Sequence, residues 1–128
     1  YALTSDGALA DPLEALVAAN GAILAKAPTM MPLLTVTRDW LSRHQTVAIV
    51  GPDVASTQDL VDAVRDGPPR NTILMRHVSG APSDVPQLEG KVSIDGAPTA
   101  YVCHGFACSA PVTSAGELTE LLEAGLPQ

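Results

Sequence analysis

Two cysteines, Cys103 and Cys108, carry the most reactive side chains of this sequence. They lie in the stretch YVCHGFACSAPVTSAGEL, residues 101–118, and four residues separate them. A redox-active pair of the thioredoxin type has two residues between its cysteines and stands at a helix amino terminus, where the helix dipole lowers the thiol pKa. The helix predicted here begins only at Thr113 or Ser114. The spacing therefore favours a structural role, as two buried thiols or as a disulfide, over redox catalysis.

His104 is the one neighbour that could activate a cysteine or join the pair as a metal ligand. Adjacent side chains on a strand point to opposite faces, so His104 is predicted to point away from Cys103. Zinc takes about four ligands, and Cys103, His104 and Cys108 would give three at most. His44 or His77 would have to supply the fourth ligand from another part of the chain. The sequence predicts no metal site at the cysteines and no cofactor.

A second candidate site is the turn Gly51-Pro52-Asp53, which follows the apolar run TVAIVG. A glycine turn between a strand and a helix is the place where many α/β proteins bind phosphate. This turn lacks the three glycines of the dinucleotide fingerprint and the Gly-Lys-Ser/Thr end of the P-loop, and Pro52 has no amide to donate. A tight turn is the favoured interpretation. Asp53, Ser56 and Thr57 are the best candidates for holding any small anion or metal ion.

Composition excludes several classes of partner. The chain has 128 residues, 46% of them hydrophobic, which is enough for one compact domain. Seven Lys and Arg against fourteen Asp and Glu give a formal net charge of −7, which disfavours nucleic acid and anionic membranes. No apolar run approaches the roughly 20 residues of a membrane-spanning helix, and the opening YALTSDGALADP lacks the pattern of an export signal. The expectation is a soluble, cytoplasmic protein. Because the sequence has no initiator Met, we also expect it to be a fragment of a longer chain.

The first part of the chain, residues 1–45, predicts a helical hairpin. Asp11 and Pro12 have the residue types preferred at a helix start, and Pro28 ends the apolar stripe that follows. A second helix is predicted to begin at Pro32. The stripe of the first helix should be buried against a partner; its members are Leu13, Leu16, Val17, Asn20, Ile23, Leu24 and Ala27.

The second part, residues 46–128, predicts a small α/β domain. A helix start at Ser56-Thr57 lies between two short β-branched runs, which is the pattern of a βαβ unit with parallel strands. Asp95-Gly96 predicts a tight turn before a third strand. The predicted fold class is α/β. It comprises the helical hairpin, a small Rossmann-like βαβ unit with about three mainly parallel strands (46–51, 71–78 and about 100–103), and a C-terminal helix that ends at Gly125.

The last two thirds of the chain combine several motifs in a distinctive order. VAIVGPD is followed by a helix and then by LEGKVSIDGAPTAYVCHGFACSAPVTSAGEL. The most specific part couples the turn Ile94-Asp95-Gly96, a strand ending in Cys103, then Cys108 and the helix start PVT. Over residues 46–122 this combination resembles the carboxyl end of the YyaL family. That family comprises bacterial and eukaryotic thioredoxin-domain proteins and includes the spermatogenesis-associated member.

The resemblance implies a larger parent protein. Members of this family carry an amino-terminal thioredoxin-like domain, then an (α/α)6 toroid similar to those of sugar-processing epimerases, and a small α/β portion at the end. By position, the hairpin would be the last helical pair of the toroid. The thioredoxin motif and the toroid cavity would lie upstream of Tyr1, so no catalytic residue is carried over onto this chain.

The expected function is therefore that of a non-catalytic, C-terminal structural or interaction portion of a YyaL-like protein. Its expected partners are the upstream toroid and thioredoxin-like domains of the parent chain. Two alternatives stay open: a thiol-redox accessory that uses Cys103 and Cys108, and a small-anion or nucleotide-binding α/β module at the Gly51 turn. Taken alone, the fragment would expose apolar side chains of its hairpin and is expected to self-associate as a homo-oligomer.

Overall fold

The computed structural model of the chain describes residues 3–4, 6–68, 71–105 and 107–124, and it has a mixed α/β fold. The expected α/β class is confirmed. No helix among these residues is long and apolar enough to cross a membrane. The elements within these residues are, in chain order, α1 (Gly7–Ala19), α2 (Gly21–Lys26), η1 (Pro28–Met30), α3 (Pro32–Arg43), β1 (Gln45–Gly51), η2 (Ala55–Thr57), α4 (Gln58–Asp66), β2 (Thr72–Val78), η3 (Pro86–Leu88), β3 (Thr99–His104), β4 (Ala107–Cys108) and α5 (Ala115–Ala124).

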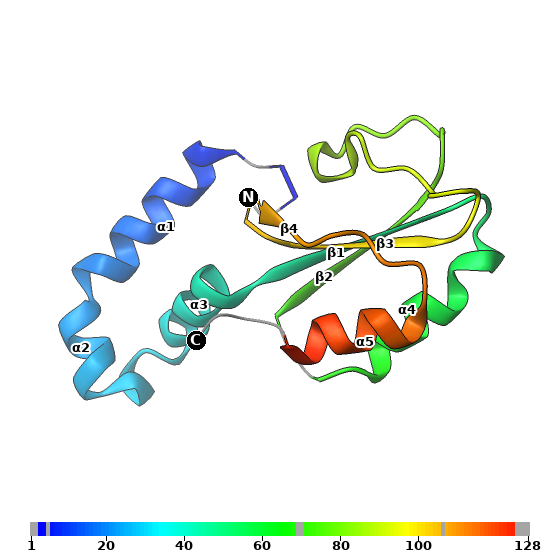
Figure 1. Cartoon of the computed structure of the whole chain (residues 1–128). Coiled ribbons are helices and arrows are strands. Elements are labelled where there is room, and N and C mark those ends of the chain that lie inside the picture. The colour runs from blue at the N-terminus through cyan, green and yellow to red at the C-terminus, as the bar shows by residue number, and fades with distance from the viewer. Residues whose placement is uncertain (1–2, 5, 69–70, 106, 125–128) are drawn as a thin grey trace.

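The sheet has the strand order β2-β1-β3-β4, so β1 lies in its interior (Figure 1). β1 runs parallel to β2 and antiparallel to β3, while β3 and β4 form an antiparallel hairpin. All seven residues of β1 are buried, as expected for an apolar run that is covered on both faces. The predicted strand–helix–strand unit is confirmed as β1, α4 and β2.

The expectation of mainly parallel strands is wrong, because β1 and β2 are the one parallel pair in the described sheet. A further parallel strand needs a crossover, usually helical, that carries the chain back to the other end of the sheet. The connection from β2 to β3 is instead a loop with one short 3₁₀ turn. β3 therefore enters at the end where β2 stops and runs back beside β1 (Figure 1).

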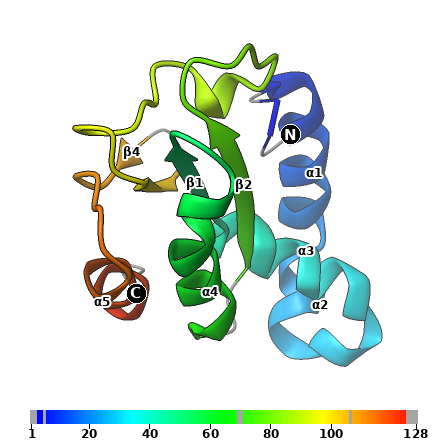
Figure 2. The ribbon, with the colours of Figure 1, turned by 90° about the vertical axis from the view of Figure 1, so that its right-hand side faces the viewer.

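Two helices, α4 and α5, cover one face of the sheet, and the hydrophobic core lies between them and the strands (Figure 2). Leu118 of α5 is completely buried there. Burying a side chain of this size stabilises the fold by about 1.5–3 kcal/mol. Gly125, predicted to end the last helix, lies outside the described residues. The core residues are Val47, Ile49, Leu60, Val61, Ala100, Val102, Leu118 and Leu122.

The loop between β2 and β3 lies over the opposite face of the sheet (Figure 1). Tyr101 of β3 holds this loop in place through two hydrogen bonds: the Tyr101 hydroxyl donates to Val92 O at 2.8 Å and accepts from the Val92 amide at 3.4 Å. The turn predicted at Asp95-Gly96 is confirmed. Its φ angles of 51° and 73° are in the left-handed region that Asp and Gly tolerate best.

The first helix of the hairpin starts earlier than expected. α1 begins at Gly7 because the Asp6 carboxylate caps it and accepts from the Ala8 amide at 2.9 Å. The predicted start at Asp11 and Pro12 is wrong. Pro12 lies inside α1, where its fixed φ suits a helix and its missing amide removes one hydrogen bond.

The sequence predicted one helix before Pro28, but the structure has two, α1 and α2, which meet at Asn20. The Asn20 side-chain amide donates to Leu16 O at 2.9 Å, and the Asn20 carbonyl accepts from the amides of Ile23 and Leu24 at 3.1 and 3.0 Å. A short polar side chain that bonds the backbone competes with helical hydrogen bonds, and this ends α1 and starts α2. α3 begins at Pro32, as predicted.

Candidate functional site

The two cysteines face each other across the β3–β4 hairpin and are joined by a disulfide. Their Cα atoms are 4.0 Å apart. Gly105, with φ of 59°, supplies the left-handed residue that the reversal between the strands needs. Cys103 is 1% exposed, whereas Cys108 is exposed. The bond thus runs from a buried strand to a solvent-facing edge, and it leaves neither cysteine as a free thiol.

The disulfide lies on the face of the sheet that α4 and α5 do not cover. Val102 belongs to the core beneath these helices, and side chains alternate along a strand, so Cys103 points to the other face. The same alternation places His104 on the side of Val102, away from the sulfur atoms. Within the described ranges, no group of three or more His, Cys, Asp or Glu side chains could hold a metal ion.

The predicted ligand turn after β1 is held together by its own hydrogen bonds. Asp53 Oδ1 accepts from the Ser56 amide at 2.8 Å, and the Ser56 hydroxyl donates to Asp53 O at 3.0 Å. The Thr57 hydroxyl donates to Val54 O at 2.7 Å, and Thr57 is completely buried. The groups expected to hold an ion therefore already bind one another.

Arg76 of β2 reaches across to this turn, a contact that sequence reasoning missed. Its Nε donates to the Thr57 hydroxyl, and its Nη2 donates to Val54 O and to Gln58 Oε1, the last at 3.3 Å. The parallel register opposite Ile49 brings Arg76 near the end of β1. The sequence shows a single Arg within the apolar run at 71–78, which is an unusual place for a charge. Only the strand register shows that Arg76 contacts the turn after β1.

Gly51 is needed at the turn because there is no room for a side chain. A Cβ at this position would collide with Cγ2 of Thr57 and would lie 3.1 Å from Ser56 Oγ and 3.2 Å from Asp53 O. The glycine of a phosphate-binding turn is kept so that a ligand can approach the backbone. Here the space is filled by the protein itself, which supports the tight-turn interpretation.

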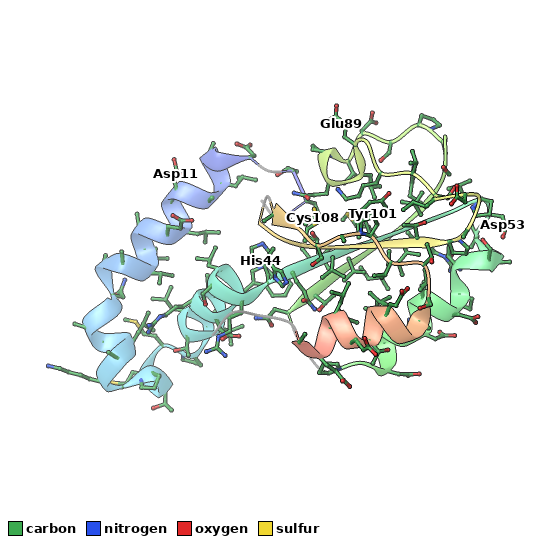
Figure 3. The ribbon with its side chains drawn as sticks, viewed as in Figure 1. Asp11, His44, Asp53, Glu89, Tyr101 and Cys108 are labelled. Carbon is green, nitrogen blue, oxygen red and sulfur yellow. A yellow bond between two sulfur atoms is a disulfide. The ribbon has the colours of Figure 1, made fainter. Side chains whose placement is uncertain are left out.

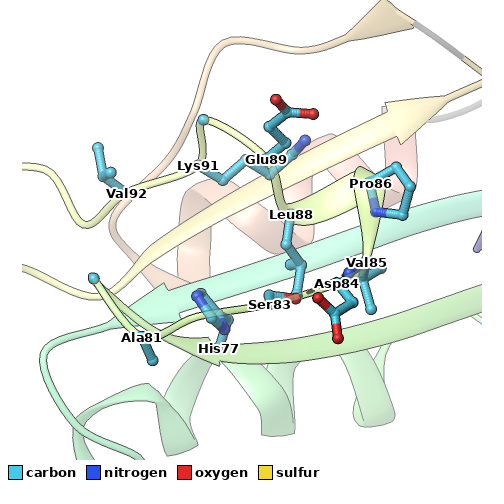
Figure 4. A pocket seen from close by; sticks show the side chains of 12 residues that line it. His77, Ala81, Ser83, Asp84, Val85, Pro86, Leu88, Glu89, Lys91 and Val92 are labelled. Atoms are coloured by element: carbon cyan, nitrogen blue, oxygen red, sulfur yellow. Dashed lines mark hydrogen bonds between the residues drawn. The ribbon is translucent and has the colours of Figure 1, made fainter.

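A hollow of about 460 Å³ lies beside the carboxyl end of β2, under the loop that follows it (Figure 4). Its polar lining includes His77 from β2 and Asp84, Glu89 and Lys91 from the loop, and Figure 4 shows Leu88 pointing from the loop toward the sheet. Two acids, a base and an imidazole favour no single class of ligand. The sequence offered only a Gly- and Pro-rich surface loop here.

An apolar groove of about 520 Å³ lies between α1, α3 and β2. Leu13 comes from α1, Val36 and Trp40 from α3, and Ile73 from β2. The Trp40 ring stacks on His44 with 6.0 Å between ring centroids. None of the described residues that line this hairpin groove is charged.

Only Leu24 of the predicted stripe is buried, in line with the expectation that the hairpin taken alone exposes apolar side chains. Leu24 is only 4% exposed, but Leu16 is 51% exposed, and on α3 Leu33 is 79% exposed. The stripe needs a partner that these residues of the chain do not supply. The exposed apolar side chains of the hairpin, called the hairpin face below, are Leu9, Leu13, Leu16, Ile23, Met30, Leu33 and Val36.

The structure thus brings the residues of the predicted ligand turn together and joins the two cysteines covalently. It also adds Arg76 and the hairpin groove, which motif analysis did not identify as sites. Comparison of the chain with protein-family models, with curated proteins and with solved structures gives no match in any of the three. Membership of the YyaL family therefore stays a prediction from the motifs of residues 46–122.

Proposed function

We propose that this chain is a non-catalytic interaction module that docks through its hairpin face on the helices of a larger protein. Following the resemblance, the partner is the α/α toroid of a YyaL-like parent chain, with a thioredoxin-like domain further upstream. We also place the module in the cytoplasm, as its sequence leads us to expect. The observation that carries the proposal is the exposure of apolar side chains on both α1 and α3.

In the chain alone, these side chains do not gain the free energy of complete burial. Leu13 is 38% exposed and Val36 is 63% exposed. Complete burial of such a side chain is worth about 1.5–3 kcal/mol relative to exposure. A partner that covers several members of the hairpin face gains the part of this free energy that belongs to the area still exposed, and this gain offsets the cost of ordering the interface.

The shape and chemistry of the hairpin groove favour a helical partner. Leu13 and Val36 line it from two different helices, so the groove follows the seam between α1 and α3. The apolar ridge of a third helix packs into such a seam by the ordinary ridges-into-grooves geometry. The absence of charge among the described lining residues disfavours a strongly charged partner segment.

The interior contacts of the Gly51 turn support a non-catalytic role. The alternative treats β1, α4 and β2 as a Rossmann-like unit that binds an anion or nucleotide at Gly51. It has less support, because Asp53, Ser56 and Thr57 bond within the turn and Arg76 donates to the same atoms. A thermal-shift screen with nucleotides and sugar phosphates tests this alternative, which predicts a raised melting temperature.

Light scattering after size-exclusion chromatography tests the proposed module. The wild-type chain should self-associate with increasing concentration, because its hairpin face has no other partner. The double variant Leu13→Gln, Val36→Gln should have an association constant lower by about tenfold or more, with unchanged helix content. The matched control is Val54→Gln, Val92→Gln, since these side chains are 55% and 53% exposed outside the hairpin.

Co-expression with the proposed partner, the toroid segment of the parent chain, is the second test of the docking proposal. The wild-type chain should co-purify with that segment, and Leu13→Gln, Val36→Gln should not. The Val54→Gln, Val92→Gln control should behave as wild type. A chain that stays monomeric at every concentration and does not bind the upstream segment contradicts the proposal.

A further inference from the structure

We propose that the Cys103–Cys108 disulfide is a thiol–disulfide exchange site, at which Cys108 forms a mixed disulfide with a cellular thiol such as glutathione. This inference is independent of the docking role of the hairpin face. It rests on where the two sulfur atoms lie and on what holds the strands around them.

The two cysteines differ in their exposure to solvent. Cys103 is 1% exposed and pairs with Thr46 of β1 in the interior of the sheet. Cys108 is exposed and belongs to β4, an edge strand of two residues. Figure 3 shows Cys108 well removed from the Gly51 turn marked by Asp53. Thiol–disulfide exchange depends on access to the attacked sulfur, and the difference in residue exposure makes Cys108 the favoured target of an incoming thiolate.

The disulfide also lies outside the hydrophobic core. The core packs between the sheet and the helices α4 and α5, whereas Cys103 points to the opposite face. Opening the disulfide removes no contact among the core residues. Reduction should therefore leave the molecule folded, which a reversible exchange site requires.

The chain that follows β4 is held on β3 by backbone hydrogen bonds. The Ser109 amide donates to Val102 O at 2.9 Å, and Ala100 and Val112 exchange two hydrogen bonds of 2.8 and 3.0 Å. One residue lies between Ala100 and Val102 on β3, but two lie between their partners Ser109 and Val112, so the edge segment contains a bulge that includes Pro111. These bonds do not involve the sulfur atoms and keep the segment on β3 when the disulfide opens.

The exchange balances as two successive displacements. A thiolate attacks Sγ of Cys108, a new S–S bond forms between that sulfur and the incoming thiol, and the Cys103–Cys108 bond breaks. Cys103 leaves as a thiolate and takes up a proton. A second thiol then attacks the mixed disulfide, which releases Cys108 as a thiol; the two external thiols are oxidised to a disulfide and the protein cystine is reduced by two electrons.

Mass spectrometry of the full chain in native buffer tests the proposal. The chain is incubated with millimolar reduced glutathione, and free thiols are then blocked with N-ethylmaleimide. We expect a glutathione adduct on Cys108 and N-ethylmaleimide on Cys103, assigned by peptide mapping. Circular dichroism of the reduced chain should retain the helix signal of the oxidised chain.

Two single variants give a matched comparison of the cysteines. Cys103→Ser leaves Cys108 as a free thiol, and Cys108→Ser leaves Cys103. With oxidised glutathione, Cys108 should form the mixed disulfide about tenfold faster or more than Cys103, because only Cys108 is accessible. Equal rates, an adduct on Cys103, or a cystine that is reduced only after unfolding in urea would each overturn the proposal. If a variant does not fold, the adduct position in the wild-type chain decides.

Discussion

Arg76 on β2 donates a hydrogen bond from its Nε to the hydroxyl of Thr57 at the amino end of α4. The same guanidinium also donates to Val54 O and Gln58 Oε1. One side chain of the second strand thus fixes both the turn that leaves the first strand and the start of the helix between them. The βαβ unit is closed by a polar contact at the end where α/β folds commonly bind ligands.

Thr57→Val should lower the free energy of unfolding by about 1 kcal/mol, because it removes the acceptor for Arg76 and the bond to Val54 O without changing the volume. Urea unfolding followed by far-UV circular dichroism measures this. Thr37→Val is the control, since its hydroxyl bonds only Leu33 O on α3, and it should change stability by about 0.5 kcal/mol or less. Equal losses in the two variants would mean that the Arg76 contact contributes nothing.

Gly51→Ala should destabilise the chain by about 1–3 kcal/mol, because the new Cβ meets Cγ2 of the fully buried Thr57. Gly116→Ala is the control: a Cβ there, in the first turn of α5, has no heavy atom within 4 Å. It should be neutral or stabilising by about 0.4–1 kcal/mol. Thermal and urea unfolding of both variants measure the difference. A Gly51→Ala variant as stable as wild type would show that the turn has space for a ligand.

Leu118→Ala should cost about 2–5 kcal/mol, because Leu118 is completely buried between α5 and the sheet and its removal leaves a cavity. Leu33→Ala, which truncates a side chain that is 79% exposed, should change stability by about 0.5 kcal/mol or less. The comparison separates the core from the hairpin face. Similar losses for both would indicate that Leu33 is buried in solution, as it would be in a stable oligomer.

Cys103→Ser combined with Cys108→Ser should lower stability by about 2 kcal/mol, because the disulfide closes only a short loop and so removes little entropy from the unfolded chain. The reduced wild-type chain should have the same urea midpoint as this double variant, whereas the oxidised chain should unfold at a higher concentration. Identical midpoints for all three samples would show that the bond does not form in solution.

Local patterns in the sequence predicted much of the α/β part correctly. The β-branched run at 46–51, the helix after Ser56-Thr57 and the Asp95-Gly96 turn all formed where the sequence placed them. Each of these depends on residues that are close together in the chain: a periodicity, a cap, or a residue that accepts positive φ. The helix start predicted at Asp11 was wrong because another capping residue, Asp6, lies five residues earlier and is the one that caps α1.

The sequence by itself determined the fold class, the strand–helix–strand unit and the closeness of the two cysteines, because these follow from interactions over a few residues. Only the tertiary structure decided that β3 runs antiparallel, that Arg76 closes the Gly51 turn and which side chains make up the exposed hairpin face. Strand direction depends on where a long connection ends, and burial depends on which surfaces meet. Both are set by contacts between distant parts of the chain, which no local pattern contains.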